Sequence, residues 1–187
     1  MIISLTGFMG SGKSSVGRKL SQLLCCPFID LDSVIEERTG RSIPEIFATD
    51  GEATFRQMEL AALRSIITPE GMVLSLGGGT VITSESAKLV HEQTICIYLR
   101  TSVDTLVSRL ADVAAGRPLL KATPNEAADS GSRRSALQLR IRSLMSQRAS
   151  TYERTAHHII DTDDLSIDEV AEQILKNCLT TAEVELR

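Results

Sequence analysis

The chain opens with MIISLTGFMGSGKSSVGRKL, residues 1–20, in which Gly7–Ser14 fits the pattern G-x-x-x-x-G-K-[ST]. A short apolar stretch, Met1–Thr6, precedes the glycines, and a helical pattern runs over Lys13–Leu24. Strand, glycine-rich loop and helix in this order favour phosphate binding, because successive backbone N–H groups and the helix N-terminus point at one anion. We expect Lys13 to reach the β- and γ-phosphates of a nucleotide and the Ser14 hydroxyl to ligate Mg²⁺.

Beyond this loop, strand-like and helix-like patterns alternate along the chain. The further expected strands are Pro27–Asp30, Met72–Leu76, Thr94–Leu99 and His157–Asp161. The further expected helices are Ser33–Arg38, Ile43–Phe47, Glu52–Ile67, Ser84–His91, Val103–Leu110, Leu137–Ser150 and Ile167–Asn177. This alternation predicts an α/β fold in which right-handed crossovers build a parallel sheet of five strands.

We expect one domain over residues 1–187, because the chain is long enough for a single core and has no internal repeat. We expect the folded core of this domain to comprise residues from about 1–110 and 137–177. The stretch 111–134, which we expect to be a mobile lid, is rich in Ala, Gly, Pro, Ser and charged residues and lacks periodicity, which is typical of a functional lid or a disordered segment. Residues 178–187 are expected to form a frayed tail.

The composition narrows the class of protein. A net charge of −4 and the lack of tryptophan argue against a nucleic-acid-binding surface. The sequence contains no apolar run of membrane-spanning length and no leader-like N-terminus, so we expect no membrane span or secretory signal. Cys25, Cys26, Cys96 and Cys178 lack the spacing of metal ligands or disulfides, which predicts reduced thiols in a cytoplasmic protein.

Acidic residues and glycines follow two of the expected strands. Asp30 and Asp32 come at the end of one strand, and Gly77–Gly79 follow the next. Because ligands of open α/β sheets bind beyond the carboxyl ends of the strands, we expect both groups to face the phosphate site. One carboxylate can hold Mg²⁺ through water and the other can orient an attacking hydroxyl, although one could instead cap the helix beginning near Ser33. The glycines either admit a ligand to the backbone or form a flexible turn.

Three arginines lie in segments with other distinctive residues. These are Arg56 in GEATFRQMEL, Arg117 in RPLL and Arg148 in RASTY. A guanidinium group can bind a carboxylate bidentately or stabilise a phosphoryl group during transfer. Spacing alone does not distinguish these arginines from solvated surface residues.

The chain resembles the shikimate kinase family in a series of segments that runs from Ile2 to about Leu175: GFMGSGKSSVGRKL, FIDLDSVIEERTGRSIPEIFATDGEATFRQMEL, LSLGGG, RPLL and the late R-x-x-x-Y. The resemblance implies a three-layer P-loop α/β sandwich of the nucleoside-monophosphate-kinase type, with a five-stranded parallel sheet and a mobile lid. It also implies Mg-ATP-dependent transfer of the γ-phosphate to the 3-hydroxyl of shikimate in the chorismate pathway of aromatic amino-acid biosynthesis.

The same resemblance implies roles for individual residues. The catalytic residues would be Lys13, Asp32 and Arg117. The ATP-binding residues would be Gly10, Ser11, Gly12, Lys13, Ser14, Ser15, Arg109 and Arg117. The shikimate-binding residues would be Asp32, Arg56, Gly78, Gly79 and Arg148, with Phe47 and Phe55 as walls of the pocket. The metal ligands would be Ser14 and, through water, Asp30.

Two features depart from the family pattern. Arg148 is followed by Ala149–Tyr152, where the family often has R-x-P-L-Y, so Arg140 remains a competitor for its role. The segment after Leu120 is also long for a compact lid. Two other functions stay open: a different small-molecule P-loop kinase such as a gluconate kinase, and a nucleotide-binding module without activity. We expect a monomer whose partners are ATP and shikimate, and which binds neither nucleic acid nor membranes.

Overall fold

The computed structural model describes residues 1–68, 71–111, 120 and 130–185. Within them the sheet consists of β1 (Ile2–Thr6), β2 (Phe28–Asp30), β3 (Met72–Ser75), β4 (Ile95–Arg100) and β5 (His158–Asp161). The strands are parallel and lie in the order β2-β3-β1-β4-β5. The expected parallel five-stranded sheet is therefore confirmed.

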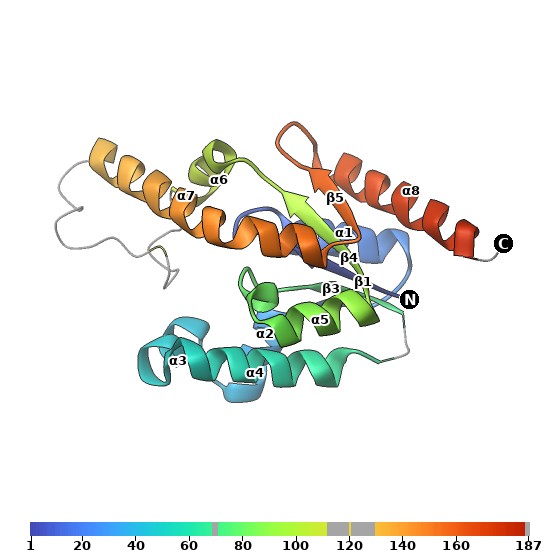
Figure 1. The fold of residues 1–187 in the computed structure, drawn as a ribbon, viewed down its shortest axis with the longest axis horizontal. Helices are drawn as coiled ribbons and strands as arrows, with labels where there is room; N and C mark the ends of the chain where they lie inside the picture. The colour runs from blue at the N-terminus through green and yellow to red at the C-terminus, as the bar shows by residue number, and fades with distance from the viewer. Residues whose placement is uncertain (69–70, 112–119, 121–129, 186–187) are drawn as a thin grey trace.

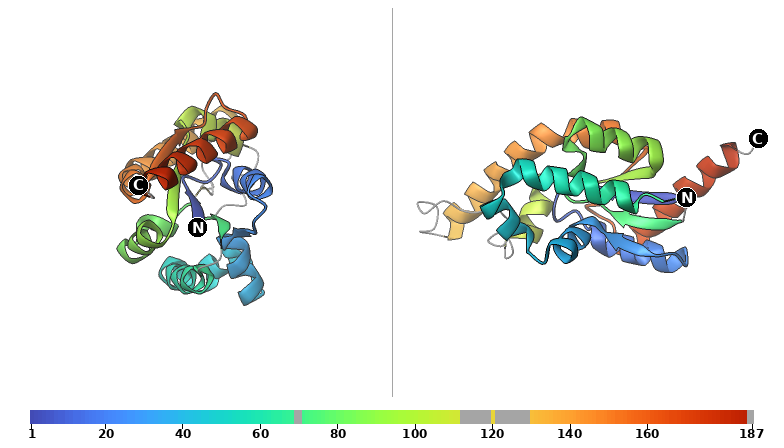
Figure 2. Two further views of the ribbon diagram at one scale, coloured as in Figure 1. Left: turned by 90° about the vertical axis from the view of Figure 1, so that its right-hand side faces the viewer. Right: turned by 90° about the horizontal axis from the view of Figure 1, so that it is seen from below.

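Helices connect the strands and cover both faces of the sheet (Figures 1 and 2). They are α1 (Lys13–Leu23), α2 (Leu31–Thr39), α3 (Ile43–Thr49), α4 (Gly51–Ile66), α5 (Ser84–Gln93), α6 (Val103–Leu110), α7 (Ser130–Thr155) and α8 (Ile167–Glu185), with a 3-10 turn, η1, at Thr80–Ile82. No helix in the described ranges has the length and apolar character that crossing a bilayer requires.

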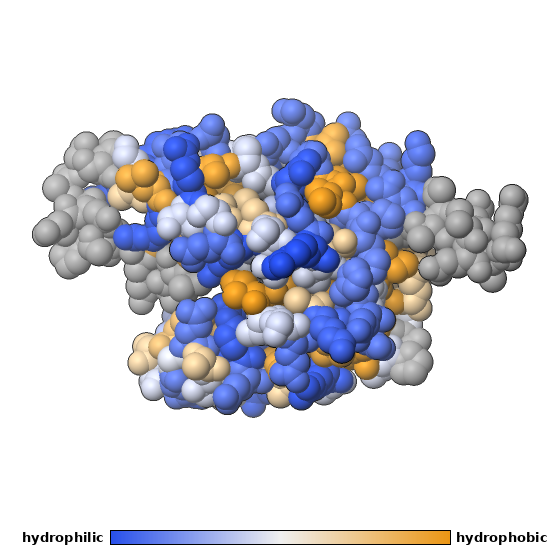
Figure 3. Space-filling view, in the orientation of Figure 1, coloured by the Kyte–Doolittle hydropathy of each residue, from blue (hydrophilic) through white to orange (hydrophobic). Residues whose placement is uncertain are grey.

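Alternation along the strands sorts the core into two layers, because successive strand residues point to opposite faces. Ile3 and Leu5 pack against α1 and α8 on one face. Leu74 and Tyr98 belong to the cluster on the other face, which includes residues of α4, α5 and α7. Hydrophilic side chains predominate on the outer surface shown in Figure 3, with apolar ones in small separate patches.

A third apolar cluster ties the phosphate loop to the helices beside it. Phe8 lies in that loop and is buried with Leu106 and Leu110 of α6 and with Leu137 and Ile141 of α7. Burying an aromatic side chain of this size contributes about 1.5–3 kcal/mol. The loop and the N-terminal half of α7 are thus held by the same core.

Two helix starts differ from the sequence expectation. The structure caps α2 with Asp30, whose Oδ1 accepts hydrogen bonds from the backbone N–H groups of Asp32 (3.2 Å) and Ser33 (3.5 Å), so the prediction of a start near Ser33 was wrong. The structure also begins α7 at Ser130 instead of Leu137. Once α7 is packed, each added turn costs little, because propagation is far easier than nucleation.

The C-terminal helix is longer than expected. The structure continues α8 to Glu185, past the predicted end at Asn177. Residues 178–185 contain neither glycine nor proline, so nothing in the backbone chemistry stops the helix there. The expected lid over 111–134 lies largely outside the described residues. Its last five positions are helical, and Leu120 is buried in the third apolar cluster.

Candidate active site

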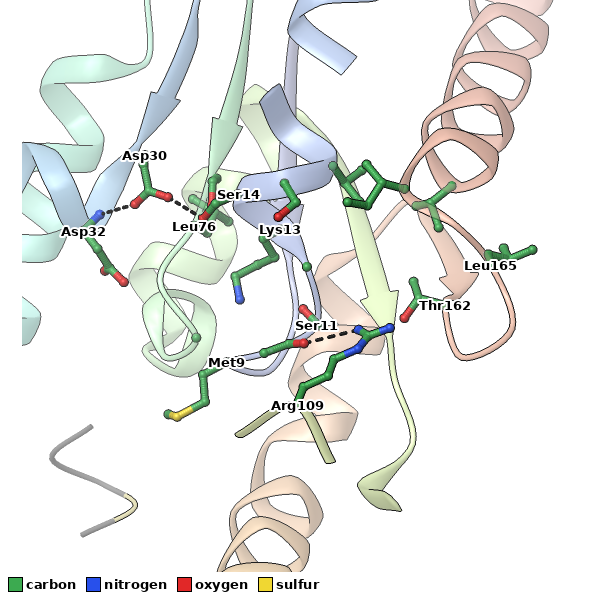
Figure 4. Close-up of a pocket in the computed structure, with 18 residues that line it drawn as sticks. Met9, Ser11, Lys13, Ser14, Asp30, Asp32, Leu76, Arg109, Thr162 and Leu165 are labelled. Atoms are coloured by element: carbon green, nitrogen blue, oxygen red, sulfur yellow. Dashed lines mark hydrogen bonds between the residues drawn. The ribbon is translucent and has the colours of Figure 1, made fainter. Parts of the chain in front are cut away.

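A cleft of about 530 Å³ opens beyond the carboxyl ends of the strands (Figure 4). It lies where the strand order reverses around β1, as expected for an open parallel sheet. It is lined by residues 9–16, Asp30, Asp32, Ser75, Leu76, Gly78, Arg109, Thr162, Leu165, Ile167 and Val170. The cleft therefore collects the phosphate loop, both acids and the end of β3.

The phosphate loop curls around the amine of Lys13. Gly10 and Gly12 have φ angles of 84° and 95°, a left-handed conformation that side chains strongly disfavour. Lys13 Nζ donates hydrogen bonds to the carbonyl oxygens of Gly7 and Phe8, both at 3.0 Å. The lysine side chain is 8% exposed, so its charge sits at the floor of the cleft beside the N-terminus of α1. This is a cradle for an anion.

Three oxygen-bearing side chains meet at the edge of the loop. The Ser14 hydroxyl donates to Asp30 Oδ2 at 2.7 Å and lies 3.5 Å from the Ser75 hydroxyl. Asp30 and Ser75 are register partners on β2 and β3, which explains their proximity. Hard oxygen ligands of this kind fit Mg²⁺, which typically uses one or two carboxylates together with substrate phosphates and water. In the described part of the chain, no three His, Cys, Asp or Glu side chains form a cage for a metal.

Asp32 is a half-buried carboxyl group that lines the cleft, close to other acidic side chains. Burial raises its pKa to about 6, and the negative charges of Glu59 and Asp30 act in the same direction. The positive charges of Lys13 and Arg56 oppose the shift. A carboxyl group in this state is a base matched to neutral pH, since it is ionised at pH 7 yet holds a proton more readily than an ordinary aspartate.

Arg56 is held by two acids of its own helix. Its guanidinium forms ion pairs with Glu59 at 2.6 Å and Glu52 at 3.0 Å, and Glu59 also accepts a hydrogen bond from the Thr80 hydroxyl. Glu59 is 1% exposed, so its carboxylate holds the Arg56 guanidinium from the protein interior. The guanidinium also lies 5.3 Å from the ring centre of Phe55. These contacts fix Arg56 in one orientation in the N-terminal half of α4.

The triple glycine passes between these charged groups. A Cβ on Gly77 would lie 2.6 Å from Asp32 Oδ1, and a Cβ on Gly79 would lie 2.3 Å from Arg56 Nη2. A Cβ on Gly78 would lie 3.2 Å from the backbone nitrogen of Met9 in the phosphate loop. A side chain at Gly77 or Gly79 would therefore displace Asp32 or Arg56 from its position, which a flexible turn would not require.

Arg148 is buried on α7 beside the same loop. It is 6% exposed, and its Nη1 atom has no hydrogen-bond partner among the described residues. Tyr152, one turn further along α7, donates its hydroxyl to the carbonyl oxygen of Gly78. The charges of both Arg148 and Arg56 act on that hydroxyl, so the two arginines converge on one small region. Arg140, the competitor for Arg148, instead donates to the carbonyl oxygen of Leu120 at 3.3 Å.

The structure brings together nearly all of the residues singled out from the sequence. Residues 10–15, Asp30, Asp32, Gly78 and Arg109 line the cleft, and Arg109 Nη1 donates to the carbonyl oxygen of Gly10 at 3.3 Å. Arg56, Gly79 and Arg148 adjoin it through the triple glycine. Phe47 packs on Phe55 at 4.8 Å between ring centres, next to Arg56. Arg117 lies outside the described residues.

Sequence reasoning did not single out several residues of the site. Glu59 follows Arg56 by three positions, which is the spacing of helical ion pairs and could have indicated its role. Ser75 ends a buried strand next to the one ended by Asp30. Leu165 in the loop between β5 and α8, and Ile167 at the start of α8, also line the cleft, and nothing in their local pattern points to a ligand.

Comparison with known proteins places this site in a family. A family model described as shikimate kinase matches residues 9–179. The shikimate kinase of Thermus thermophilus is 41% identical over 97% of this chain and 91% of its own, and that of Salinibacter ruber is 38% identical over 99% and 87%.

Solved structures agree with this result. The shikimate kinase from Acinetobacter baumannii, in complex with shikimate, matches with a TM-score of 0.85 and 32% identity, covering 96% of this chain and 93% of that one. These matches confirm the expected P-loop fold of the nucleoside-monophosphate-kinase type. A gluconokinase from Sinorhizobium meliloti 1021, with a TM-score of 0.58 and 21% identity, shares the fold alone. Because the family match spans most of the sequence and full-length relatives exceed 30% identity, the chain belongs to the shikimate kinase family.

Proposed function

We propose that this chain is a shikimate kinase that transfers the γ-phosphate of ATP to the 3-hydroxyl of shikimate, giving shikimate 3-phosphate and ADP in aromatic amino-acid biosynthesis. The observation that carries the proposal is the convergence of Arg56 and Arg148 on the triple glycine, directly beside the phosphate loop. Shikimate has one carboxylate and three hydroxyl groups. Two guanidinium groups suit the carboxylate, and Asp32 suits the hydroxyls.

The phosphoryl group is transferred by positioning and charge neutralisation. Lys13 and the loop N–H groups bind the β- and γ-phosphates, and Arg109 lies near the adenosine end of the cleft. Arg117 would add positive charge at the phosphoryl group, and water exclusion would prevent hydrolysis. Product analysis tests this assignment: ³¹P–¹H coupling in the product should place the new phosphate on the 3-hydroxyl. Phosphate on another hydroxyl would contradict it.

We assign Mg²⁺ as the divalent cofactor, with Ser14 as a direct ligand and Asp30 binding through water. When bound, the ion neutralises phosphate charge and orients the polyphosphate. Ser14 and Asp30 are already hydrogen-bonded at 2.7 Å, which supports a shared role. Excess EDTA should abolish ADP release and Mg²⁺ should restore it. Full activity with all divalent metal chelated would contradict the assignment.

We propose that Asp32 orients the attacking hydroxyl and accepts its proton. Since the pKa of Asp32 is about 6, its carboxylate is protonated and inactive below that pH. We expect kcat/KM for shikimate to fall about tenfold per pH unit below 6. A Glu59→Gln variant removes one neighbouring negative charge, so the midpoint should move to lower pH. A midpoint near pH 4 in the unmodified enzyme would contradict a raised pKa at Asp32.

Gly79→Ala tests the packing of the triple glycine on Arg56. The added Cβ would sit 2.3 Å from Arg56 Nη2, so the guanidinium must leave its position between Glu52 and Glu59. We expect KM for shikimate to rise about tenfold, the lower end for a charge-assisted hydrogen bond, while KM for ATP changes little. Gly71→Ala is the matched control, since its Cβ meets nothing closer than the Met1 carbonyl oxygen at 3.3 Å. Equal effects of the two substitutions would contradict this role.

The proposal includes a monomer that acts in the cytoplasm, where ATP is supplied. The large apolar side chains that are exposed on the described residues are scattered over several elements, which supports the monomer: Met1, Leu23, Ile82, Leu139, Ile159 and Ile167. Cys25, Cys26 and Cys96 are free thiols, which suits a reducing compartment. Light scattering at micromolar concentration tests the oligomeric state, and a dimer mass would contradict it.

A further inference from the structure

In the described residues, the peptide between Gly78 and Gly79 is hydrogen-bonded through its carbonyl oxygen and not through its N–H group. The carbonyl oxygen of Gly78 accepts the hydroxyl of Tyr152, which is fully buried. The N–H of Gly79 belongs to the same peptide and donates no hydrogen bond to other described residues. In a planar trans peptide the N–H points opposite to the carbonyl. Fixing the Gly78 oxygen therefore aims the Gly79 N–H away from the Tyr152 hydroxyl. Gly79 itself lies against Arg56, since a Cβ on it would be 2.3 Å from Arg56 Nη2.

The same tyrosine lies beside Arg148. Burial raises the pKa of Tyr152 to about 12, while the charge and hydrogen bonding of Arg148 lower it. The hydroxyl is therefore protonated at neutral pH and donates to Gly78 while Arg148 lies next to its oxygen. Its ring packs on Tyr98 of β4 at 5.2 Å between ring centres, which holds the hydroxyl in place. Helix α7 and the glycine loop are thus joined through one phenol.

We propose that Tyr152 is a positioning residue for shikimate, which fixes the Gly78–Gly79 peptide and the Arg148 guanidinium relative to each other. The proposal rests on the function proposed above. Arg148 then binds the carboxylate at the same time as the Gly79 N–H meets the substrate. Tyr152 acts through these two groups, and no contact of its own with the substrate is needed.

Tyr152→Phe removes the hydroxyl and keeps the ring. We expect KM for shikimate to rise roughly tenfold, as for loss of a hydrogen bond next to a charged group, with KM for ATP within twofold of the wild type. Tyr98→Phe is the matched control: its ring is equally buried and touches Tyr152, but the charges near its hydroxyl are Glu153, Arg100 and Asp161. We expect that variant to keep both KM values within twofold.

A double-mutant cycle distinguishes an effect of Tyr152 through Arg148 from a nonspecific loss of order in the site. If Tyr152 acts through Arg148, the effects of Tyr152→Phe and Arg148→Met on KM for shikimate should be less than additive. Additive effects would overturn the proposal, and so would a Tyr152→Phe enzyme that keeps its wild-type KM for shikimate or raises KM for both substrates equally. A wild-type enzyme that turns over ATP with no shikimate dependence would instead overturn the proposed function.

A second measurement leaves position 152 unchanged, in case the phenylalanine variant does not fold. The chain has two tyrosines, so 3-fluorotyrosine in the Tyr98→Phe background labels Tyr152 alone. We expect saturating shikimate to shift its ¹⁹F resonance and Mg-ATP alone to leave it within the line width. No shift with shikimate, or an equal shift with either ligand, would overturn the proposal.

Discussion

Lys13→Met lowers kcat by about 100- to 1000-fold, the usual cost of losing one charge-stabilising group in a transition state. The amine lies in the phosphate loop with its charge directed into the cleft, and methionine keeps the length of the side chain without the charge. We expect the fold to persist, because the Phe8 carbonyl oxygen still accepts the Ser11 N–H at 3.1 Å after the lysine is replaced. Steady-state ADP release and circular dichroism measure the two effects.

Lys19→Met is the matched control for this experiment. It makes the same substitution in the same helix, where Lys19 pairs with Asp168 at 2.7 Å on the surface. Such surface pairs contribute at most about 1 kcal/mol, so we expect kcat to stay within twofold of the wild type. Equal kcat values for the Lys13→Met and Lys19→Met enzymes would contradict the assignment of Lys13 to the phosphates.

Arg148→Ala raises KM for shikimate by roughly 10- to 150-fold, which corresponds to about 1.5–3 kcal/mol for a hydrogen-bonded charged pair. The guanidinium is buried, and its Nη1 atom lacks a partner among the described residues, which is costly unless a ligand anion supplies one. KM for ATP should change little, because Arg148 does not line the cleft around the phosphate loop. Initial rates with each substrate varied in turn give both constants.

Two arginines of the same helix serve as comparisons. Arg140 lies about 12 Å from Arg148 along the axis of α7, at 1.5 Å per residue, and bonds to the Leu120 carbonyl oxygen. Arg142 is exposed. We expect Arg140→Ala and Arg142→Ala to leave KM for shikimate within threefold of the wild type. A larger rise for Arg140→Ala than for Arg148→Ala would transfer the carboxylate-binding role to Arg140.

The phosphate site could be predicted from the sequence because its parts are local. Lys13 and Ser14 follow a strand and a glycine loop within a few positions, so one short pattern determines their placement. The acids after β2 were also found, since strand ends gather at one edge of a parallel sheet. Which acid caps α2 could not be deduced from spacing. Asp30 caps it and also contacts Ser14, which leaves Asp32 to line the cleft beside Glu59.

The shikimate subsite depends on contacts between distant segments. Tyr152 and Gly78 are 74 positions apart, and Thr80 and Glu59 are 21 apart, so no local pattern pairs them. Family resemblance named Arg56 and Arg148, but only the packing of α7 on the sheet distinguishes Arg148 from Arg140. The early start of α7 also escaped prediction, because the apolar contacts of Leu137 and Ile141 with α6 stabilise a helix whose first turn has a weak pattern.

Coupled ADP release with Mg-ATP and shikimate, quinate or gluconate as acceptor tests the central claim most directly. A folded, ATP-binding sample should release ADP with shikimate and show only background with the other two. Turnover with gluconate and not shikimate would retain the role of the phosphate loop and contradict the arginine subsite. A sample that binds ATP but releases ADP with none of the three acceptors would contradict the assignment of a kinase altogether.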